Sequence, residues 1–422
     1  MAPLSLLLLF LTLQSANSQI PATKTFTFTN AGDLVYNVAE YAASYREVRA
    51  AGYTFSTFPF TLCFYNSTPG KYILAVRGGV RRDKEPNRWV WEANRRRPVG
   101  EKATLTLRRD GNLVLAEADG AVAWQTNTAA AGVDGIKLLG NGNLILHSQN
   151  GIPIWQSFDH PIDTLLAGMS LKLRSTRLIS RKSATDAADG KYSLILEDNG
   201  VIVYLNNSGD LIRYADFSGY SGTAATFTTV KLNTTSSDLI FKYEGPPPGT
   251  SVGGIRRLKT LNYDAKYSFL RLSADGSVDA FTYTSGGWIQ SFAYFGDYHD
   301  RKCALPASCG EFGLCENGTC VSCPSRKGLL PWTPNCSPPQ LPNCGGAAGI
   351  RYYRIDRAEH FLTLQMSAER LKLRECREKC SRDCNCKGFV YQRAEMLCLT
   401  VPVLATLIRD SPEYSVYVKY SK

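Results

Sequence analysis

The sequence lacks several features that would place it in common protein classes. After an apolar run near the N-terminus, no stretch approaches the ~20 apolar residues that a membrane-spanning helix requires. Only four histidines are present, and none has the spacing of a metal-binding motif. Cysteine is almost absent from the first 302 residues, where Cys63 stands alone. We therefore expect no membrane span, no bound metal and no cofactor.

The N-terminus has the pattern of a secretory signal peptide. Leu4 to Leu13 is almost entirely apolar but too short to cross a bilayer, and the small residues Ala16 and Ser18 precede Gln19. We expect residues 1–18 to be removed and the mature chain to be soluble, secreted and extracellular.

The cysteines agree with export. Twelve of the thirteen lie between Cys303 and Cys398. In a secreted chain this density is typical of disulfides in small modules, whereas a metal site would need reduced thiols. For Cys63 we expect a buried free thiol rather than an intermolecular bridge. Sequons also predict a glycoprotein, with acceptors at Asn66, Asn206, Asn233, Asn317 and Asn335.

The net charge is +11, and eight cations lie within one stretch of twenty-one residues that holds only three acids, Asp83, Glu85 and Glu92. Its cations are Arg77, Arg81, Arg82, Lys84, Arg88, Arg95, Arg96 and Arg97. A basic face gains affinity for a polyanion by releasing counterions, and outside the cell an acidic polysaccharide is a better candidate than nucleic acid. The alternative is an ordinary solvated face.

A repeat dominates the first third of the chain. "GNLVLAEADGAVAWQTN" at 111–127 is echoed by "GNLILHSQNGIPIWQSF" at 142–158. Asp-Gly and Asn-Gly pairs supply tight turns between runs of alternating apolar residues, so each copy predicts a β-hairpin. A looser copy contains Trp91, which corresponds to Trp124 and Trp155. Such hairpins cannot bury a face alone, and we expect them to stack around a common axis that holds the three tryptophans.

Three such units resemble the bulb-type mannose-binding lectin domain, a three-sided β-prism, over residues 30–160. In that family each sugar site carries Gln-x-Asp-x-Asn-x-Val-x-Tyr on one strand. The first copy matches at Asp110, Asn112 and Val114, with Arg108 and Ala116 as departures. The second copy offers Asn141, Asn143 and Ile145, with Leu139 and His147 as departures.

Two interpretations of these residues stay open. They are remnants of a carbohydrate site, or they are residues that a hairpin turn prefers. A site without two of its donors would bind a monosaccharide weakly, with altered specificity. Affinity would then come from several sites acting together.

The stretch "GIPIWQSFDHPIDTLLAGMSLKL" at 151–173 resembles the sequence that follows the lectin domain in plant S-locus glycoproteins and their receptor kinases. Its Ser157 and His160 lack a nucleophile elbow or oxyanion loop, so we expect no catalytic residues and no enzyme. Between 161 and 300 the strand–turn–strand rhythm recurs, which predicts a second, degraded lectin-like module without a sugar motif.

Two small modules complete the chain. Residues 303–336 resemble an EGF-like module without calcium-binding acids, which implies pairs Cys303–Cys315, Cys309–Cys320 and Cys323–Cys336. Residues 344–420 resemble a PAN/apple domain, which implies pairs Cys376–Cys398, Cys380–Cys386 and Cys344–Cys384. Ser367 is expected to cap a helix that runs to about Ser381.

The whole arrangement resembles the plant epidermis-specific secreted glycoproteins. The resemblance implies an all-β dominated protein of tandem β-prisms followed by an EGF-like module and an α+β PAN domain. It also implies a non-catalytic, lectin-like glycoprotein of the cell wall or apoplast whose partners are wall glycans or glycoproteins. The alternative is a structural glycoprotein that has lost sugar binding and recruits a protein partner through its PAN and EGF-like modules.

Overall fold

The computed structural model describes most of the chain in two compact units, residues 1–157 and 158–422. The described residues are 19–21, 25–36, 39–50, 53–80, 85–198, 200–217, 227–245, 255–296, 303–341, 349–363, 368–409 and 411–421. The expected signal peptide lies outside them. Among the described residues, no helix is long and apolar enough to cross a membrane.

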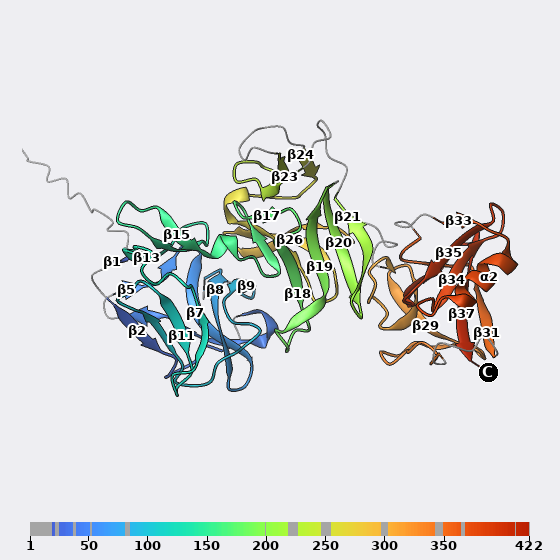
Figure 1. Cartoon of the computed structure of the whole chain (residues 1–422), viewed down its shortest axis with the longest axis horizontal. Coiled ribbons are helices and arrows are strands. Elements are labelled where there is room, and N and C mark those ends of the chain that lie inside the picture. Colours follow the sequence, from blue (N-terminus) through green and yellow to red (C-terminus); the bar gives the residue numbers. More distant parts are fainter. Residues whose placement is uncertain are drawn as a thin grey trace, which may run out of the picture. The chain divides into compact units, whose positions relative to one another are not determined.

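The first unit is built from three main sheets (Figure 1). Sheet A comprises β3 (Ser44–Glu47), β7 (Phe60–Thr68), β8 (Lys71–Gly78) and β9 (Arg88–Glu92), with β6 (Ser56–Thr57) paired to β7. Sheet B comprises β2 (Phe26–Thr29), β10 (Thr104–Leu107), β11 (Leu113–Ala116) and β12 (Val122–Gln125). Sheet C comprises β1 (Gln19–Pro21), β13 (Gly135–Leu138), β14 (Leu144–His147) and β15 (Pro153–Gln156). A short ribbon, β4 (Arg49–Ala50) with β5 (Tyr53–Thr54), and the 3-10 helix η1 (Glu40–Ala42) complete the unit's elements, and the 3-10 helix η2 (Ser157–Asp159) follows at the boundary to the second unit.

The three repeated tryptophans meet at the centre of this prism. The ring centroids of Trp91 and Trp124 lie 6.1 Å apart, those of Trp91 and Trp155 5.9 Å, and those of Trp124 and Trp155 5.7 Å. The three interplanar angles are 70°, 72° and 74°, so every pair is edge to face, the arrangement that aromatic quadrupoles favour. One tryptophan from each sheet therefore closes a pseudo-threefold core, as the repeat predicts.

Strand register makes the three sheets equivalent residue by residue. Trp91, Trp124 and Trp155 pair with Val76, Leu115 and Leu146. Directly after each of these pairs the register shifts by a bulge. A bulge at the same place in all three sheets shows that the repeat extends to backbone irregularities, which sequence similarity alone does not reveal.

The second unit begins with another set of three four-stranded sheets. One comprises β16 (Thr164–Leu166), β25 (Ser268–Leu272), β26 (Val278–Thr284) and β27 (Gly287–Ala293). The next comprises β17 (Ser170–Lys172), β22 (Thr229–Leu232), β23 (Leu239–Glu244) and β24 (Ile255–Leu258). The last comprises β18 (Arg177–Arg181), β19 (Asp189–Glu197), β20 (Gly200–Asn207) and β21 (Asp210–Asp216). The 3-10 helix η3 (Ala265–Tyr267) precedes β25.

The disulfide-rich segments form two five-stranded sheets. One comprises β30 (Gly328–Pro331), β29 (Thr319–Ser325), β28 (Phe312–Glu316), β36 (Ala405–Arg409) and β32 (Ala358–His360). The other comprises β31 (Ile350–Asp356), β37 (Tyr414–Ser421), β34 (Gly388–Gln392), β35 (Leu397–Val401) and β33 (Glu369–Arg370). Because β28 pairs in parallel with β36, the EGF-like and PAN segments share a sheet.

The helix of the PAN segment is shorter than expected. Helix α2 (Leu373–Arg382) begins after Lys372, because Glu369 and Arg370 pair with β35 as a strand. The expected start is therefore wrong, and Ser367 lies outside the described residues. Cys376 and Cys380 do lie on the buried face of α2, as expected from their spacing.

The disulfides are those that the two resemblances imply. They join Cys303–Cys315, Cys309–Cys320, Cys323–Cys336, Cys376–Cys398 and Cys380–Cys386. Cys384 is also disulfide-bonded, while Cys344, its expected partner, lies outside the described residues. Bridges of this kind stabilise small modules whose apolar cores are limited.

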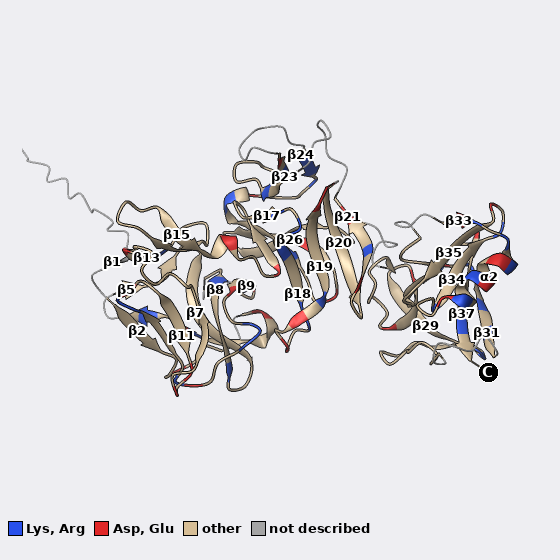
Figure 2. Cartoon of the chain, in the orientation of Figure 1, with Lys and Arg blue, Asp and Glu red and all other residues tan. Residues whose placement is uncertain are grey.

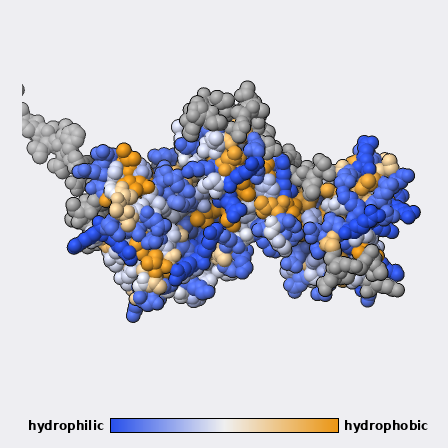
Figure 3. All heavy atoms as spheres, viewed as in Figure 1, coloured by the Kyte–Doolittle hydropathy of each residue, from blue (hydrophilic) through white to orange (hydrophobic). Residues whose placement is uncertain are grey.

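Figures 2 and 3 show the distribution of charged and apolar residues. Charged residues of both signs occur on both units (Figure 2), and the visible face is largely hydrophilic with small, separate apolar patches (Figure 3). Large exposed apolar side chains, such as those of Ile152 and Leu261, are scattered along the chain. The fold class expected from the sequence, tandem β-prisms followed by disulfide-rich and PAN modules, is confirmed.

Candidate functional site

The first candidate carbohydrate site lies at the turn between β10 and β11. Asp110 is exposed, and its carboxylate accepts a hydrogen bond from the backbone N–H of Asn112 at 2.9 Å. Asn112 is buried: its amide donates to Gln125 Oε1 at 3.0 Å, and its Oδ1 accepts from Thr126 Oγ1 at 3.1 Å and the Thr128 N–H at 3.2 Å. Asn112 thus ties the turn to the tryptophan-bearing strand.

The second candidate site repeats this geometry. Asn141 accepts from the Asn143 N–H at 3.2 Å. The Asn143 amide donates to Gln156 Oε1 at 2.9 Å, and its Oδ1 accepts from Ser157 Oγ at 3.1 Å. The same three-residue linkage therefore closes both hairpins, and Ser157 acts in it as a structural hydroxyl.

The apolar positions of the motif are closed. Val114 is 2% exposed and Ile145 is 5% exposed, so neither offers an open surface for the carbon face of a sugar. His147, at the position where the lectin motif has tyrosine, is also buried, and its Nδ1 lies 2.9 Å from the Ser148 carbonyl oxygen. Asp110 and its neighbour Arg108 remain as the exposed polar groups of the first site.

Sheet A shows where the third site of the prism would lie. By register, Ile73, Ala75 and Arg77 of β8 correspond to Asn112, Val114 and Ala116 of β11. Side chains of the protein itself occupy this face. Arg77 donates to the Tyr45 hydroxyl and to Thr61 Oγ1, and its guanidinium carbon lies 4.8 Å from the Tyr45 ring centroid.

Aromatic and charged side chains complete this internal cluster. The rings of Tyr65 and Trp89 stack with centroids 4.1 Å apart, and the Tyr65 hydroxyl donates to Glu92. Glu92 in turn lies 3.8 Å from Arg95 Nη1, and both side chains are buried. The rings of Tyr45 and Trp89, whose centroids lie 6.0 Å apart, link these groups to Arg77, so the position equivalent to a sugar site in sheet A serves as a second core.

Cys63 lies in the same cluster. It is fully buried on β7, and it is the free cysteine of the described residues. Burial raises the pKa of its thiol to about 12, so the group stays protonated and is a poor nucleophile. The expected buried free thiol is therefore what the structure contains.

The basic stretch does not form one exposed face. Arg77 and Arg95 are each 4% exposed, and Arg88 is half-buried with its Nη1 3.3 Å from Glu40 Oε2. Residues 81–84 lie outside the described residues, and Arg96 and Arg97 are exposed. The hypothesis of a continuous basic face here is wrong for Arg77, Arg88 and Arg95, because these cations neutralise carboxylates or stack on aromatic rings inside sheet A.

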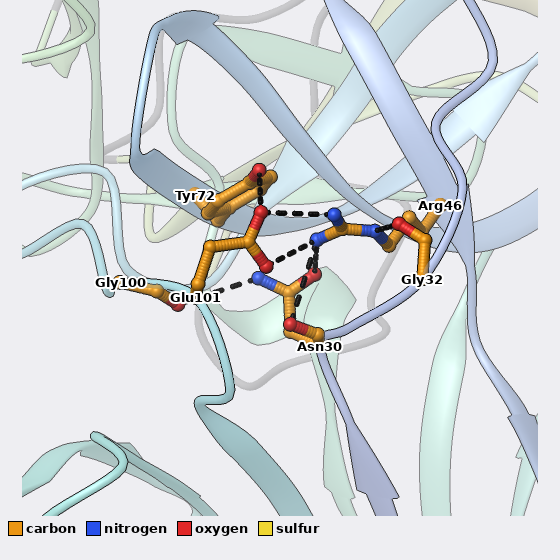
Figure 4. A network of polar contacts seen from close by, with 6 residues as sticks. All are labelled: Asn30, Gly32, Arg46, Tyr72, Gly100 and Glu101. Carbon is orange, nitrogen blue, oxygen red and sulfur yellow. Dashed lines mark hydrogen bonds and ion pairs between the residues drawn. The ribbon is translucent and has the colours of Figure 1, made fainter.

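A second polar network links sheets A and B (Figure 4). Arg46 on β3 donates two hydrogen bonds to Glu101, each of 2.9 Å, and one to Asn30 Oδ1 at 2.9 Å. The Tyr72 hydroxyl on β8 also donates to Glu101. The hydrogen bonds from Arg46 hold the pKa of the Glu101 carboxyl below its usual range. None of these residues belongs to the two candidate carbohydrate sites.

The sequons differ in accessibility. Asn206, Asn317 and Asn335 are exposed and Asn66 is half-buried, whereas Asn233 is buried and its Oδ1 accepts from the Thr234 N–H at 2.9 Å. Within the described residues, no group of three or more His, Cys, Asp or Glu side chains is placed to hold a metal ion.

Sequence reasoning missed the cluster of Arg77, Tyr45 and Glu92. Aligning β8 with β11 would have indicated it, but that alignment requires the strand register, which is known only once the bulges are located. Without that register, an arginine in a basic stretch gives no indication that it is buried.

The models of two known families match parts of the chain. The model of the D-mannose binding lectin family matches residues 88–185, and that of the PAN-like domain matches residues 352–401. The solved structure of Polygonatum cyrtonema lectin complexed with monomannoside is 24% identical to this chain, covers 26% of this chain and 78% of its own, and has a TM-score of 0.12.

Relatives match almost the entire chain. EP1-like glycoprotein 2 of Arabidopsis thaliana is 42% identical over 96% of this chain and 95% of its own length. The epidermis-specific secreted glycoprotein EP1 of Daucus carota is 40% identical over 81% of this chain and 95% of its own length. The S-locus-specific glycoprotein BS29-1 of Brassica oleracea var. alboglabra is 27% identical over 71% of both chains. The chain therefore belongs to the EP1-like family of secreted, lectin-like glycoproteins, as its sequence led us to expect.

Proposed function

We propose that this protein is a non-catalytic glycan-binding glycoprotein of the plant cell wall or apoplast, and that it contacts sugar at the β10–β11 turn. The observation that carries the proposal is the exposed carboxylate of Asp110, held in a fixed turn beside Asn112 on a lectin-type prism. A carboxylate fixed in this way accepts hydrogen bonds from sugar hydroxyls without a large entropic cost.

The geometry supports weak binding with altered specificity rather than a full mannose site. Asn112 already donates to Gln125 and accepts from two groups, and Val114 is covered. Arg108 stands where the motif has glutamine, and its cation favours an acidic sugar. The second turn presents the amide of Asn141 in place of a carboxylate, so it contributes less to sugar binding than the turn of Asp110.

A glycan array at low and moderate salt tests the proposal, with Asp110→Ala compared with Asp119→Ala. Asp119 is a matched control because it is exposed and accepts from the Ala121 N–H at 2.9 Å in the other turn of the same hairpin unit. Hydrogen bonds to charged groups contribute about 1.5–3 kcal/mol, so Asp110→Ala should weaken binding by roughly tenfold or more. Equal signals from the two variants would contradict a sugar site at Asp110.

The second candidate function is recruitment of a protein partner through the PAN and EGF-like segments by a chain that has lost sugar binding. The filled face of sheet A and the closed positions Val114 and Ile145 favour it. An absence of glycan signal, together with a protein that co-purifies with the wild-type chain and is lost when residues 303–422 are removed, would support this alternative over the first.

A further inference from the structure

The second unit contains a large cavity that neither candidate function uses. Its volume is about 1150 Å³, slightly above the ~300–1,000 Å³ of small-molecule sites. Its walls come from β19, the β20–β21 hairpin, the EGF-like segment, the chain at 338–341 and the PAN segment. All of these lie in the same compact unit.

The lining is amphipathic. Prolines from four stretches supply apolar carbon surface, and they are Pro306, Pro334, Pro338, Pro339 and Pro402. Lys191, Glu311 and Arg382 add charged groups that remain exposed. Apolar C–H faces bordered by donors and acceptors suit a ligand with the same alternation, which is the chemistry of a carbohydrate rather than of a purely apolar molecule.

One side of the cavity carries an attachment point for such a ligand. Asn206, Asn207 and Ser208 form a sequon, and all three line the cavity. Asn206 is exposed, and its Oδ1 accepts from the Gly209 N–H at 2.8 Å. This bond turns the oxygen into the β-turn and leaves the amide nitrogen, the atom that carries an N-linked glycan, on the other side of the group.

The hairpin that bears the sequon is held against the opposite wall. Asn207 Nδ2 donates to the carbonyl oxygen of Pro402 in the PAN segment at 3.4 Å. The residue next to the glycan acceptor therefore already spans the cavity at one edge. A sugar attached to Asn206 begins beside this contact and has the cavity directly in reach.

We propose that an N-linked glycan on Asn206 packs its first sugars into this cavity and joins the second prism to the EGF-like and PAN segments. The glycan acts as an internal part of the fold. The proline surfaces cover the C–H faces of the sugars, and Lys191, Glu311 and Arg382 lie at the border where hydroxyls need partners. This proposal is independent of sugar binding at Asp110.

Two glycine substitutions provide a matched test on the secreted full-length glycoprotein. Ser208 and Asn317 both have positive φ angles, of 56° and 50°, so glycine is accepted at either position without backbone strain. Ser208→Gly removes the sequon and keeps the Asn206 side chain. Asn317→Gly removes a sequon at another exposed turn, outside the cavity lining.

Glycopeptide mass spectrometry measures the occupancy of each sequon, and peptide:N-glycosidase A measures how fast each glycan is released from the native protein. Thermal unfolding measures the stability of each variant. We expect an occupied Asn206 whose glycan is released several-fold more slowly than that of Asn317 in the native state and at the same rate after denaturation. Ser208→Gly should lower the unfolding midpoint by several degrees relative to Asn317→Gly. An unoccupied Asn206, equal native release rates, or equal midpoints for the two variants would each overturn the proposal.

Discussion

At the scale of single residues, Glu101 is a sensitive point of the first unit because it neutralises a buried arginine. Glu101→Gln keeps the shape but removes the charge that pairs with Arg46, whose side chain is 8% exposed while that of Glu101 is 48% exposed. Discounted for solvent screening, the expected loss is about 1–2 kcal/mol of unfolding free energy. Chemical denaturation measures it, with Glu85→Gln at an exposed position as the control.

The same carboxyl makes the first unit sensitive to acid. The pKa of Glu101 is lowered in the folded state, so its contribution is complete above the unfolded-state pKa and is lost as the pH falls through the folded one. Glu101→Gln should therefore lose less stability on acidification than the wild type. An identical pH dependence for the two proteins would contradict the ion pair.

His360 is a second acid-sensitive residue, and it lies in the PAN segment. It is fully buried, its Nε2–H donates to the Leu404 carbonyl at 2.9 Å, and its Nδ1 accepts from the Leu362 N–H at 3.2 Å. Burial lowers its pKa from 6.5 to about 4. Between these values the unfolded chain binds a proton that the folded chain does not, so stability falls as pH falls, by up to about 3 kcal/mol.

Unfolding of wild type and His360→Gln from pH 7 to pH 4 tests this expectation. Glutamine retains an N–H donor for Leu404 and does not titrate, so the variant should lose less stability across the window than the wild type. Parallel curves would show that His360 does not account for the acid sensitivity of this segment.

At the scale of elements, the asparagines of the two hairpins are predicted to matter more for stability than for binding. Asn112→Ala leaves the buried Thr128 N–H without its partner and removes one hydrogen bond each from Gln125 Oε1 and Thr126 Oγ1. Leaving buried polar groups unsatisfied costs about 1–3 kcal/mol, whereas Gln149→Ala at an exposed turn should cost almost nothing. Thermal unfolding compares the two, and equal midpoints would refute the structural role.

These hairpins also show how much of the fold can be predicted from the sequence. Asn-Gly turns, alternating apolar residues and a fixed tryptophan predict three hairpins around one core, because each signal is local. The start of α2 was not predictable in this way, since it depends on the pairing of Glu369 with Cys398 on β35. The parallel pairing of β28 with β36 is likewise a long-range contact without a local signal.

The candidate sites follow the same division. Asp110 and Asn112 were found from a motif, but their division into one exposed and one buried residue depends on Gln125 and Thr126 across the strand. The burial of Arg77 depends on Tyr45 and its neighbours on β3, which lie far from it in the sequence. Sequence patterns therefore indicated the type of site, and tertiary packing decided which of its groups can reach a ligand.

At the scale of the whole molecule, some of the cations behind the net charge of +11 are arginines buried in sheet A. A polyanion must therefore contact exposed cations elsewhere. Figure 2 shows Lys and Arg along α2, β31 and β37. Six cations and three carboxylates lie between residues 369 and 382. Because each cation that meets a polyanion releases counterions, this face of the PAN segment is the better candidate for contact with an acidic polysaccharide.

We therefore expect polygalacturonate binding to weaken steeply with salt and to depend on Arg370 and Lys372, both exposed. The double reversal Arg370→Glu and Lys372→Glu should weaken binding several-fold and reduce the slope of log affinity against log salt by about 1–2. Lys372 is the N-cap of α2, where a carboxylate is favourable, so folding should be preserved. Reversal of Arg96 and Arg97 is the matched control, and an equal loss in both variants would show that net charge alone, and not the PAN face, attracts the polyanion.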